Sequence, residues 1–236
     1  MELHGLDTER EVFFYEQDFY VLSNFSAFSI KWQGRRFPTS EHAYHWEKFE
    51  PGTRDEHGLY VRDRILEAVS AHEAFKLAEK WKPLRRADWD DVKVGVMRCI
   101  LREKARQHPY VLRKLLATGE RTLIENSWRD DFWGWGPNRD GQNVLGRLWM
   151  QVRAELRAED ADARNSARAA WRDVADELPQ EAQEVLFVRG GKTVHGAWIG
   201  GIFWHSNQKM AAAYWMPLPL PPNVGIEPHL PAQEVR

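Results

Sequence analysis

The chain has 236 residues, a formal net charge of −2, and 43% hydrophobic and 29% charged residues. This composition is typical of a globular protein with one or two domains, and the charge excludes a nucleic-acid-binding protein that depends on a broad basic surface. The single cysteine, Cys99, excludes an internal disulfide and a cysteine-based zinc site. No stretch has the apolar core of a signal peptide or the length to span a bilayer, so we expect a cytoplasmic protein without a membrane partner.

The first 50 residues predict strands followed by a helix. The segments EVFFYE and FSIKW are rich in β-branched and aromatic residues, and Gly34 marks a turn after the second of them. Beyond Pro38 the period becomes helical, with Thr39 or Ser40 as the N-cap and Glu41 in the first turn. The sequence therefore predicts a short hairpin that leads directly into a helix.

The pattern of residues 59–116 is helical and is interrupted by prolines. Asp88 is predicted to cap the helix that begins at Trp89. Cys99 falls on the predicted apolar side of that helix, so we expect it to be buried and structural rather than a nucleophile.

The segment TLIENSWRDDFWGWGPNRDGQNVLG is glycine-rich and irregular in its first half. A second long helix is predicted to begin near Asn143. Its buried stripe is predicted to consist of Leu145, Leu148, Val152 and Leu156.

A change of composition at AEDADARNSAR, residues 158–168, indicates a helix tail or a linker. The later segments are short and rich in β-branched and aromatic residues, with hairpin turns predicted at Gly190-Gly191 and Gly200-Gly201. We therefore predict four regions: a first domain at residues 1–160, a linker at 161–168, a small β-rich domain at 169–222 and a flexible tail at 223–236.

One candidate site surrounds Glu41. A carboxylate in the first turn of a helix is favoured by the helix dipole, and an ordinary structural glutamate would occupy the same position. Glu41 shares a polar face with His45 and Lys48, and the uncharged pair Ser23-Asn24 lies just upstream. A carboxylate in such a setting can activate water or stabilise an oxocarbenium-like sugar cation.

A second candidate site is the glycine-rich loop. Gly134 and Gly136 permit close backbone approach, and the helix beginning at Asn143 offers N–H groups to a phosphate. Asp130 and Trp133 in the same stretch suit a ribose and a stacked base. A plain turn, with the aspartate as its cap, is the alternative.

Metal and nucleophile motifs are missing from the sequence. His42 and His45 are three residues apart without an HExxH or paired-cysteine pattern, and there is no Gly-x-Ser-x-Gly elbow. We therefore expect neither a metal nor another cofactor.

Four ordered segments carry a family resemblance: VLSNFSAFSIKWQGRRFPTSEHAYHWEKF, DWDDVKVGVMRCILREKA, LLATGERTLIENS and DDFWGWGPNRDGQNVLGRLWMQVRAEL. They resemble the successive motifs of the NADAR family, also called YbiA-like, over about residues 13–156. The resemblance implies an α+β fold with a helix-rich domain, followed here by a small antiparallel β domain. It also implies hydrolysis of N-glycosidic bonds in phosphoribosylated intermediates of riboflavin synthesis, or in ADP-ribosylated guanine of nucleic acid.

The resemblance carries the family's functional positions onto this sequence as follows. The glutamate of its Pro-Thr-x-Glu-His motif is Glu41, its Asp-Trp tryptophan is Trp89, and its aspartate before Trp-Gly is Asp130. These three are the predicted catalytic residues. The predicted ligand-binding residues, which combine the resemblance with the loop pattern, are Ser23, Asn24, Phe25, Trp133, Gly134, Gly136, Asn143 and Gly146.

The chain departs from the family pattern at KARQHP, where Lys104 is retained but Ala105 and His108 differ, and in the segment EPGTRDEHGLYVRD. These departures concern substrate identity more than chemistry. The C-terminal segment, with its ending YWMPLPLPP, looks like a small domain of unknown function that is common in phage proteins. A phage-encoded enzyme would act in the host cytoplasm, and the partner of this domain is not indicated.

The function that we expect is a metal-independent N-glycoside hydrolase whose partner is an ADP-ribose-like or ribose-phosphate substrate, free or on nucleic acid. The alternative is a non-catalytic module that binds ADP-ribose or an NAD derivative. A third reading is an interaction module in which the C-terminal domain carries the function.

Overall fold

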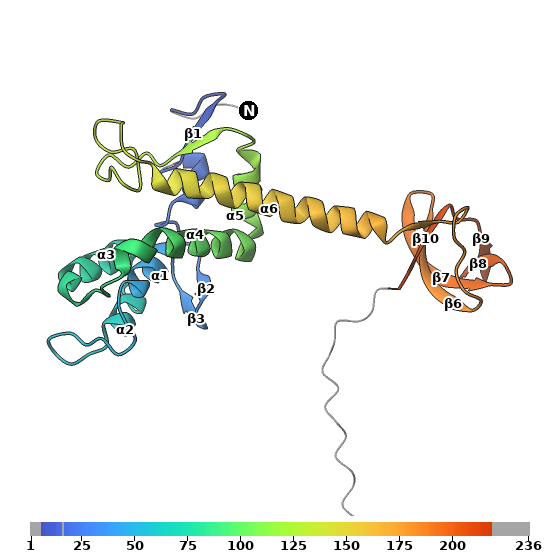
Figure 1. Cartoon of the computed structure of the whole chain (residues 1–236), viewed down its shortest axis with the longest axis horizontal. Coiled ribbons are helices and arrows are strands. Elements are labelled where there is room, and N and C mark those ends of the chain that lie inside the picture. The colour runs from blue at the N-terminus through green and yellow to red at the C-terminus, as the bar shows by residue number, and fades with distance from the viewer. Residues whose placement is uncertain (1–5, 16, 219–236) are drawn as a thin grey trace, which may run out of the picture. The chain divides into compact units, whose positions relative to one another are not determined.

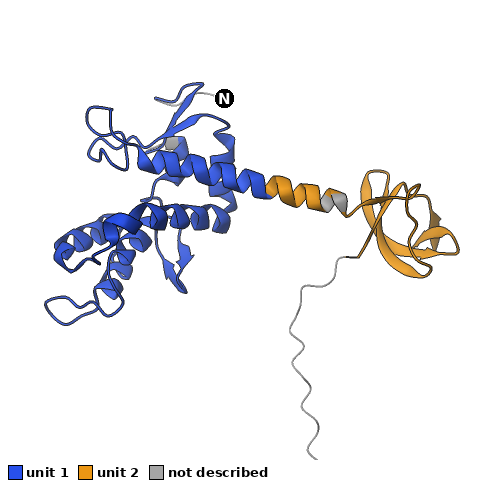
Figure 2. Cartoon of the chain, viewed as in Figure 1, with its two compact units in different colours: residues 1–159 blue, residues 160–236 orange. Residues whose placement is uncertain are grey.

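The computed structural model describes residues 6–15 and 17–218 (Figure 1). The chain divides into two compact units, residues 1–159 and residues 160–236 (Figure 2). Each unit has a hydrophobic core of its own. The predicted tail at residues 223–236 lies outside the described residues.

The N-terminal unit is mainly helical and carries two small sheets. Its elements in chain order are β1 (Glu11–Phe13), η1 (Gln17–Leu22), β2 (Ile30–Trp32), β3 (Arg35–Phe37), α1 (Ser40–Glu47), α2 (Val61–Leu66), α3 (Ala71–Lys80), η2 (Lys82–Leu84), α4 (Trp89–Gln107), α5 (Pro109–Ala117), β4 (Thr122–Ile124) and the first part of α6 (Val144–Ala169), whose last residues belong to the second unit.

The two sheets bring distant segments together. Strand β1 pairs in parallel with β4, with Val12 opposite Leu123. The residues that follow β4 therefore lie beside the residues that follow β1. Strands β2 and β3 form the predicted hairpin, and its turn has Gln33 and Gly34 at φ 47° and 74°. This left-handed conformation costs glycine little, which explains Gly34.

Helix α1 begins as the sequence predicts. Thr39 is the N-cap, and its side chain accepts a hydrogen bond from the backbone N–H of His42. Every residue of α1 is buried, including Glu41, His45 and Glu47. A helix that is buried on all sides normally carries apolar residues, so these polar side chains must find partners inside the protein.

Helix α4 differs from its prediction at two positions. Asp88 is the N-cap residue, but its side chain makes no capping hydrogen bond and instead accepts two bonds from Arg86 at 2.6 and 2.7 Å. Cys99 is exposed, so the prediction of a buried cysteine is wrong. Because α4 packs against α1, α5 and β2, the face it buries contains Met97, Ile100, Leu101 and Lys104.

The buried stripe of α6 is confirmed. Leu145, Leu148, Val152 and Leu156 are all buried, as predicted. The helix is continuous through residues 161–168, the stretch predicted to be a helix tail or linker.

The C-terminal unit contains one antiparallel sheet of six strands in the order β5-β10-β6-β7-β8-β9. The strands are β5 (Arg172–Asp173), β6 (Gln183–Arg189), β7 (Lys192–Ile199), β8 (Ile202–His205), β9 (Gln208–Met210) and β10 (Tyr214–Pro217). Both predicted glycine pairs form hairpin turns, with φ between 54° and 78°. No helix in residues 6–15 and 17–218 has the length and apolar character needed to cross a membrane.

Candidate active site

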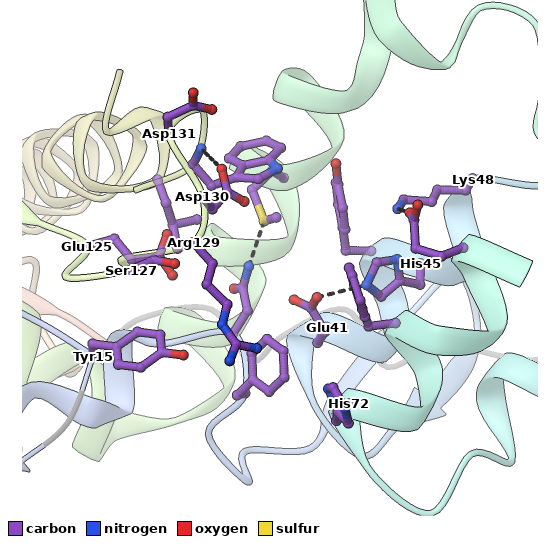
Figure 3. A pocket seen from close by; sticks show the side chains of 18 residues that line it. Tyr15, Glu41, His45, Lys48, His72, Glu125, Ser127, Arg129, Asp130 and Asp131 are labelled. Carbon is purple, nitrogen blue, oxygen red and sulfur yellow. Dashed lines mark hydrogen bonds and ion pairs between the residues drawn. The ribbon is translucent and has the colours of Figure 1, made fainter. Parts of the chain in front are cut away.

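A cavity of about 500 Å³ opens in the N-terminal unit (Figure 3). Its walls come from α1, from α3, from the segment after η1 and from residues 125–133 after β4. Of the predicted site residues, it brings together Asn24, Phe25, Glu41, Asp130 and Trp133. Figure 3 shows Glu41 on one side of the cavity and Glu125 and Asp130 on another.

Glu41 is held by two interactions. Its backbone N–H donates to the carbonyl of Asn24 at 3.2 Å, which ties α1 to the preceding loop. Its carboxylate Oε1 lies 2.7 Å from Nε2 of His45, one helical turn later. Burial lowers the pKa of His45, and the charge of Glu41 opposes this effect. A neutral imidazole with its proton on Nε2 would donate to Glu41, which leaves Nδ1 buried without a partner in the described structure.

Lys48 and Glu79 line the cavity next to this pair. The Lys48 Nζ lies 3.5 Å from a Glu79 carboxylate oxygen. Burial lowers the pKa of Lys48, while the charge of Glu79 raises it. This cation therefore already has an anionic partner.

The Ser23-Asn24 loop is held from beneath by Lys104. The Lys104 side chain is fully buried and donates to the Ser23 carbonyl at 2.8 Å and to Ser26 Oγ at 2.7 Å. Burial lowers the pKa of Lys104 to about 7. Asn24 faces the cavity, its Nδ2 lies 3.2 Å from the sulfur of Met97, and its Oδ1 is buried without a partner among the described residues. Ser23 does not line the cavity and contributes its backbone instead.

The predicted tryptophans are in different environments. Trp89 is 2% exposed and belongs to the core, where its ring packs 5.1 Å from that of Tyr44. Tyr44 lines the cavity and Trp89 does not. Trp133 does line it and meets Tyr44 edge to face at 5.5 Å. Trp89 thus supports a wall of the cavity rather than forming one.

Asp130 both caps a turn and faces the cavity. Its Oδ1 accepts the backbone N–H groups of Phe132 and Trp133 at 2.9 and 2.8 Å. This is the capping role that the sequence left open as an alternative. The side chain also lines the cavity, so its second oxygen is the one available to a ligand.

The glycine-rich loop uses its own N–H groups. Gly136 donates to the carbonyl of Ser127, and Asn143, Val144 and Leu145 donate to the carbonyls of Gly134, Phe132 and Trp133. Gly134, Gly136, Asn143 and Gly146 do not line the cavity. The N–H groups predicted to receive phosphate at the start of α6 are therefore already bonded to backbone carbonyls.

Asn143 and Gly146 attach α6 to the end of β4. Asn143 Oδ1 accepts the backbone N–H of Glu125 at 3.0 Å, and its Nδ2 donates to the Leu123 carbonyl at 2.8 Å. A Cβ on Gly146 would lie 2.1 Å from that same carbonyl. Only glycine allows the helix to approach the strand this closely.

Glu125 is a site residue that was not predicted. It is buried, it lines the cavity, and its Oε2 has no hydrogen-bond partner within the described residues. Burial, together with the charges of Glu41 and Asp130, raises the pKa of Glu125 to about 8. The available signal was a carboxylate placed directly after the apolar strand TLI.

Arg129 is the second residue of the site that was not predicted. It lines the cavity from an exposed position, and its guanidinium lies 4.1 Å from the ring centroid of Trp128. Among residues 6–15 and 17–218, no carboxylate lies within ion-pair distance of it. The charge of Arg129 is therefore available to a ligand in the cavity, whereas the charge of Lys48 is already paired with Glu79.

The described part of the chain holds no group of three His, Cys, Asp or Glu side chains placed to bind one metal ion. The cavity offers instead a carboxylate paired with histidine, a second carboxyl with a raised pKa, an arginine and several aromatic rings. Two carboxyl groups in different environments are the arrangement that acid–base hydrolysis uses.

Comparison with known proteins identifies the fold and the family. The chain is 40% identical over 150 residues to a riboflavin biosynthesis protein of Vibrio vulnificus, covering 63% of this chain and 39% of that protein. It is 38% identical over 143 residues to N-glycosidase YbiA of Escherichia coli, covering 60% of this chain and 84% of YbiA. The NMR structure of Escherichia coli YbiA matches with a TM-score of 0.58 at 34% identity, covering 66% of this chain and 90% of that chain. A family model described as the NADAR domain matches residues 13–157. The protein is thus an α+β protein, and its chain belongs to the NADAR family.

Proposed function

We propose that this protein hydrolyses the N-glycosidic bond of a base attached to a phosphorylated ribose. N-glycoside hydrolysis as such is supported by family membership and by relatives that are named N-glycosidases. The observation that carries the proposal is the buried Glu41–His45 pair, whose carboxylate faces a cavity of about 500 Å³.

Glu41 would act on the sugar carbon. As the C1′–N bond opens, positive charge develops on the ribose, and a nearby carboxylate stabilises it. The same carboxylate accepts a proton from the water that attacks C1′. The hydrogen bond from His45 occupies Oε1 and orients the group, which leaves Oε2 for the water or the sugar. The second oxygen of Asp130 would bind a ribose hydroxyl.

Arg129 would bind the phosphate. A guanidinium without a carboxylate partner among the described residues is suited to a phosphate, which it can bind through two parallel hydrogen bonds. The hydroxyl-bearing residues Tyr15 and Ser127 line the same cavity. This assignment replaces the glycine-rich loop as the phosphate site.

The base would meet aromatic rings. Phe25 and Phe75 line the cavity, and each is 40% exposed although large apolar side chains are normally covered. A flat ring stacked on either of them would bury that surface. The two substrates that fit this description are the phosphoribosylated pyrimidine of riboflavin synthesis, supported by the Vibrio vulnificus relative, and ADP-ribosylated guanine.

The test is to incubate the protein with each of the two substrates and to identify the products by mass. We expect release of the free base and the phosphorylated sugar from at least one of them, and loss of turnover in Glu41→Gln. Glu47→Gln is the matched control, because Glu47 lies on the same helix but bonds to Trp32 and does not line the cavity.

Two outcomes would contradict the proposal. One is the absence of product from both substrates, and the other is full activity of Glu41→Gln. Tight binding of ADP-ribose in calorimetry, combined with no turnover, would instead identify a binding module.

A further inference from the structure

The backbone of Glu125 is held on both sides. Its N–H donates to Asn143 Oδ1 at 3.0 Å, and its carbonyl accepts the N–H of Trp135 at 3.2 Å. A Cβ on Gly134 would lie 2.9 Å from the same carbonyl, so the glycine-rich loop wraps closely around this residue. The start of α6 and the loop, whose backbone N–H groups are bonded to carbonyls of the protein, thus hold Glu125 in one position.

Burying the side chain of Glu125 lowers the stability of the folded protein. The side chain is buried, and its Oε2 has no hydrogen-bond partner among the described residues. Buried polar atoms in proteins are almost always hydrogen-bonded, and a catalytic role is one explanation for an unpaired one. Because Glu125 lines the cavity, a ligand bound there could supply the partner that this carboxyl group lacks.

The groups around Glu125 favour its neutral form. Burial is the main cause of its raised pKa, and Glu41 on α1 and Asp130 on the loop add negative charge. Of the cations that line the cavity, Lys48 is paired with Glu79 and Arg129 is exposed. At neutral pH the carboxyl therefore retains its proton, which makes it a hydrogen-bond donor as well as an acid.

We propose that Glu125 is the general acid of the reaction and that it protonates the leaving base. This inference rests on the proposed function and adds the residue that departure of the base requires. The C1′–N bond breaks with its electron pair moving to the nitrogen, and the proton of the Glu125 carboxyl goes to the base. Water forms the new C1′–O bond, and its proton goes to Glu41. The products are the free base and the phosphorylated ribose, and proton exchange with solvent then restores both glutamates.

Other groups at the cavity are less suited to this role. The Nε2 of His45 is already engaged with Glu41, and burial favours the neutral imidazole. Asp130 accepts two backbone N–H bonds, which suits an acceptor rather than a proton donor. Lys104 is directed to Ser23 and Ser26 and does not line the cavity.

The experiment compares Glu125→Gln and Glu125→Asp with the full-length wild type. We expect Glu125→Gln to lower kcat by roughly 10²–10⁴-fold while KM changes little, and Glu125→Asp to recover part of the rate. Because the wild type needs the protonated form, its kcat/KM should fall as the pH rises through about 8. That decline should be missing from the residual activity of Glu125→Gln.

A second substrate separates acid catalysis from a structural effect. A nicotinamide N-riboside phosphate carries a positive charge on its base, which leaves as a neutral molecule and needs no proton. If the wild type cleaves this compound, Glu125→Gln should retain most of that activity; if it does not, the pH profile decides. Thermal melting of each variant at pH 7 verifies folding, and Glu120→Gln is the matched control because Glu120 lies on the surface beside Arg157.

The outcomes are distinguishable. No product from any substrate with the wild type overturns the proposed function itself. An active wild type with Glu125→Gln active to within a few fold, or with the alkaline decline unchanged in that variant, overturns only the role of Glu125. The same conclusion follows if Glu125→Gln loses equal activity on neutral and cationic bases.

Discussion

At the residue scale, the cavity contains charged groups of three kinds. Glu41 has histidine as its partner, Lys48 has glutamate, and Arg129 has no carboxylate partner in the described residues. Glu125 differs from all of these, because burial keeps it in the neutral form. Each environment suggests a separate role: contact with the sugar, structural support, phosphate binding and proton donation.

The role of Arg129 predicts a selective effect on binding. Replacing Arg129 with Gln should raise KM for a 5′-phosphorylated substrate by roughly 10–100-fold, which is the loss of one charge-assisted hydrogen-bonded contact. The rate on the matching riboside without phosphate should not change. Steady-state kinetics on the two compounds measures this difference.

Arg139→Gln is the control for that experiment. Arg139 is exposed in the same loop, lies against the ring of Trp135 and does not line the cavity. An equal loss in both variants, or an equal loss on both substrates, would contradict a phosphate site at Arg129.

The raised pKa of Glu125 also leads us to expect an unusual dependence of stability on pH. Its folded pKa of about 8 lies above the unfolded value of 4.5, so the folded protein binds the extra proton in this range. The stability of the wild type should therefore decrease as the pH rises from 4.5 to 8. Glu125→Gln avoids this cost and should be more stable than the wild type, by on the order of 3 kcal/mol at pH 7.

Urea denaturation at pH 5, 7 and 8.5 measures the effect. The difference between the variant and the wild type should be small at pH 5 and should reach its maximum near pH 8. A wild type that is the more stable of the two at pH 8.5 would show that the ionised Glu125 has a cationic partner in the folded protein.

At the element scale, the position of Glu125 depends on how β4, the glycine-rich loop and α6 meet. Gly146→Ala would place a methyl group against the Leu123 carbonyl and force α6 away from β4. We expect a loss of about 1–3 kcal/mol of stability together with reduced turnover, because Asn143 would no longer hold the backbone of Glu125. Thermal melting and the N-glycosidase assay measure the two effects.

Gly95→Ala is the matched control for that prediction. Gly95 also lies in a helix, but an added Cβ would meet no atom within 4 Å. This variant should gain up to about 1 kcal/mol, because alanine is the better helix former. Equal destabilisation by the two substitutions would show that helix contact with β4 is not the cause.

Helices α4 and α6 show where sequence patterns succeed and fail. The stripe of α6 was predictable because leucine and valine recur on one face and all of them are buried. In α4 the buried face includes Lys104, which a pattern of apolar and polar residues assigns to solvent. Its burial depends on the Ser23 carbonyl and Ser26, which lie 81 and 78 residues earlier in the chain.

At the scale of the whole molecule, the two hydrophobic cores share no residue. One includes Trp149, and the other includes Trp215 with Phe187. Trp215→Ala should therefore destabilise the C-terminal sheet by about 3–5 kcal/mol and leave kcat/KM of the hydrolase unchanged. Calorimetry of the full-length variant, with the activity assay beside it, tests this.

Trp149→Ala provides the comparison, because Trp149 is fully buried and donates to the Leu22 carbonyl at 2.8 Å in the N-terminal unit. It should reduce both stability and turnover. Loss of hydrolysis in Trp215→Ala would mean instead that the C-terminal unit takes part in catalysis.

The sequence by itself determined the features that depend on neighbours in the chain. The caps and turns at Thr39, Gly34 and the two glycine pairs follow from local backbone preferences, and the stripe of α6 follows from its period. Ordered motifs were sufficient to identify the family. Glu41 could be singled out because its motif and its helix position agree.

Only the tertiary structure decided which groups face the cavity. Whether a backbone N–H in the glycine-rich loop meets a ligand or a carbonyl depends on how that loop folds onto β4 and α6, and the sequence does not encode this locally. The same contacts bury Glu125 near Asp130 and place it close enough to Glu41 for that charge to raise its pKa, although Glu41 lies more than 80 residues earlier in the chain. The pKa of a carboxyl group is set by burial and by charges that are close in space. For that reason the residue we propose as the acid could be recognised only in the folded protein.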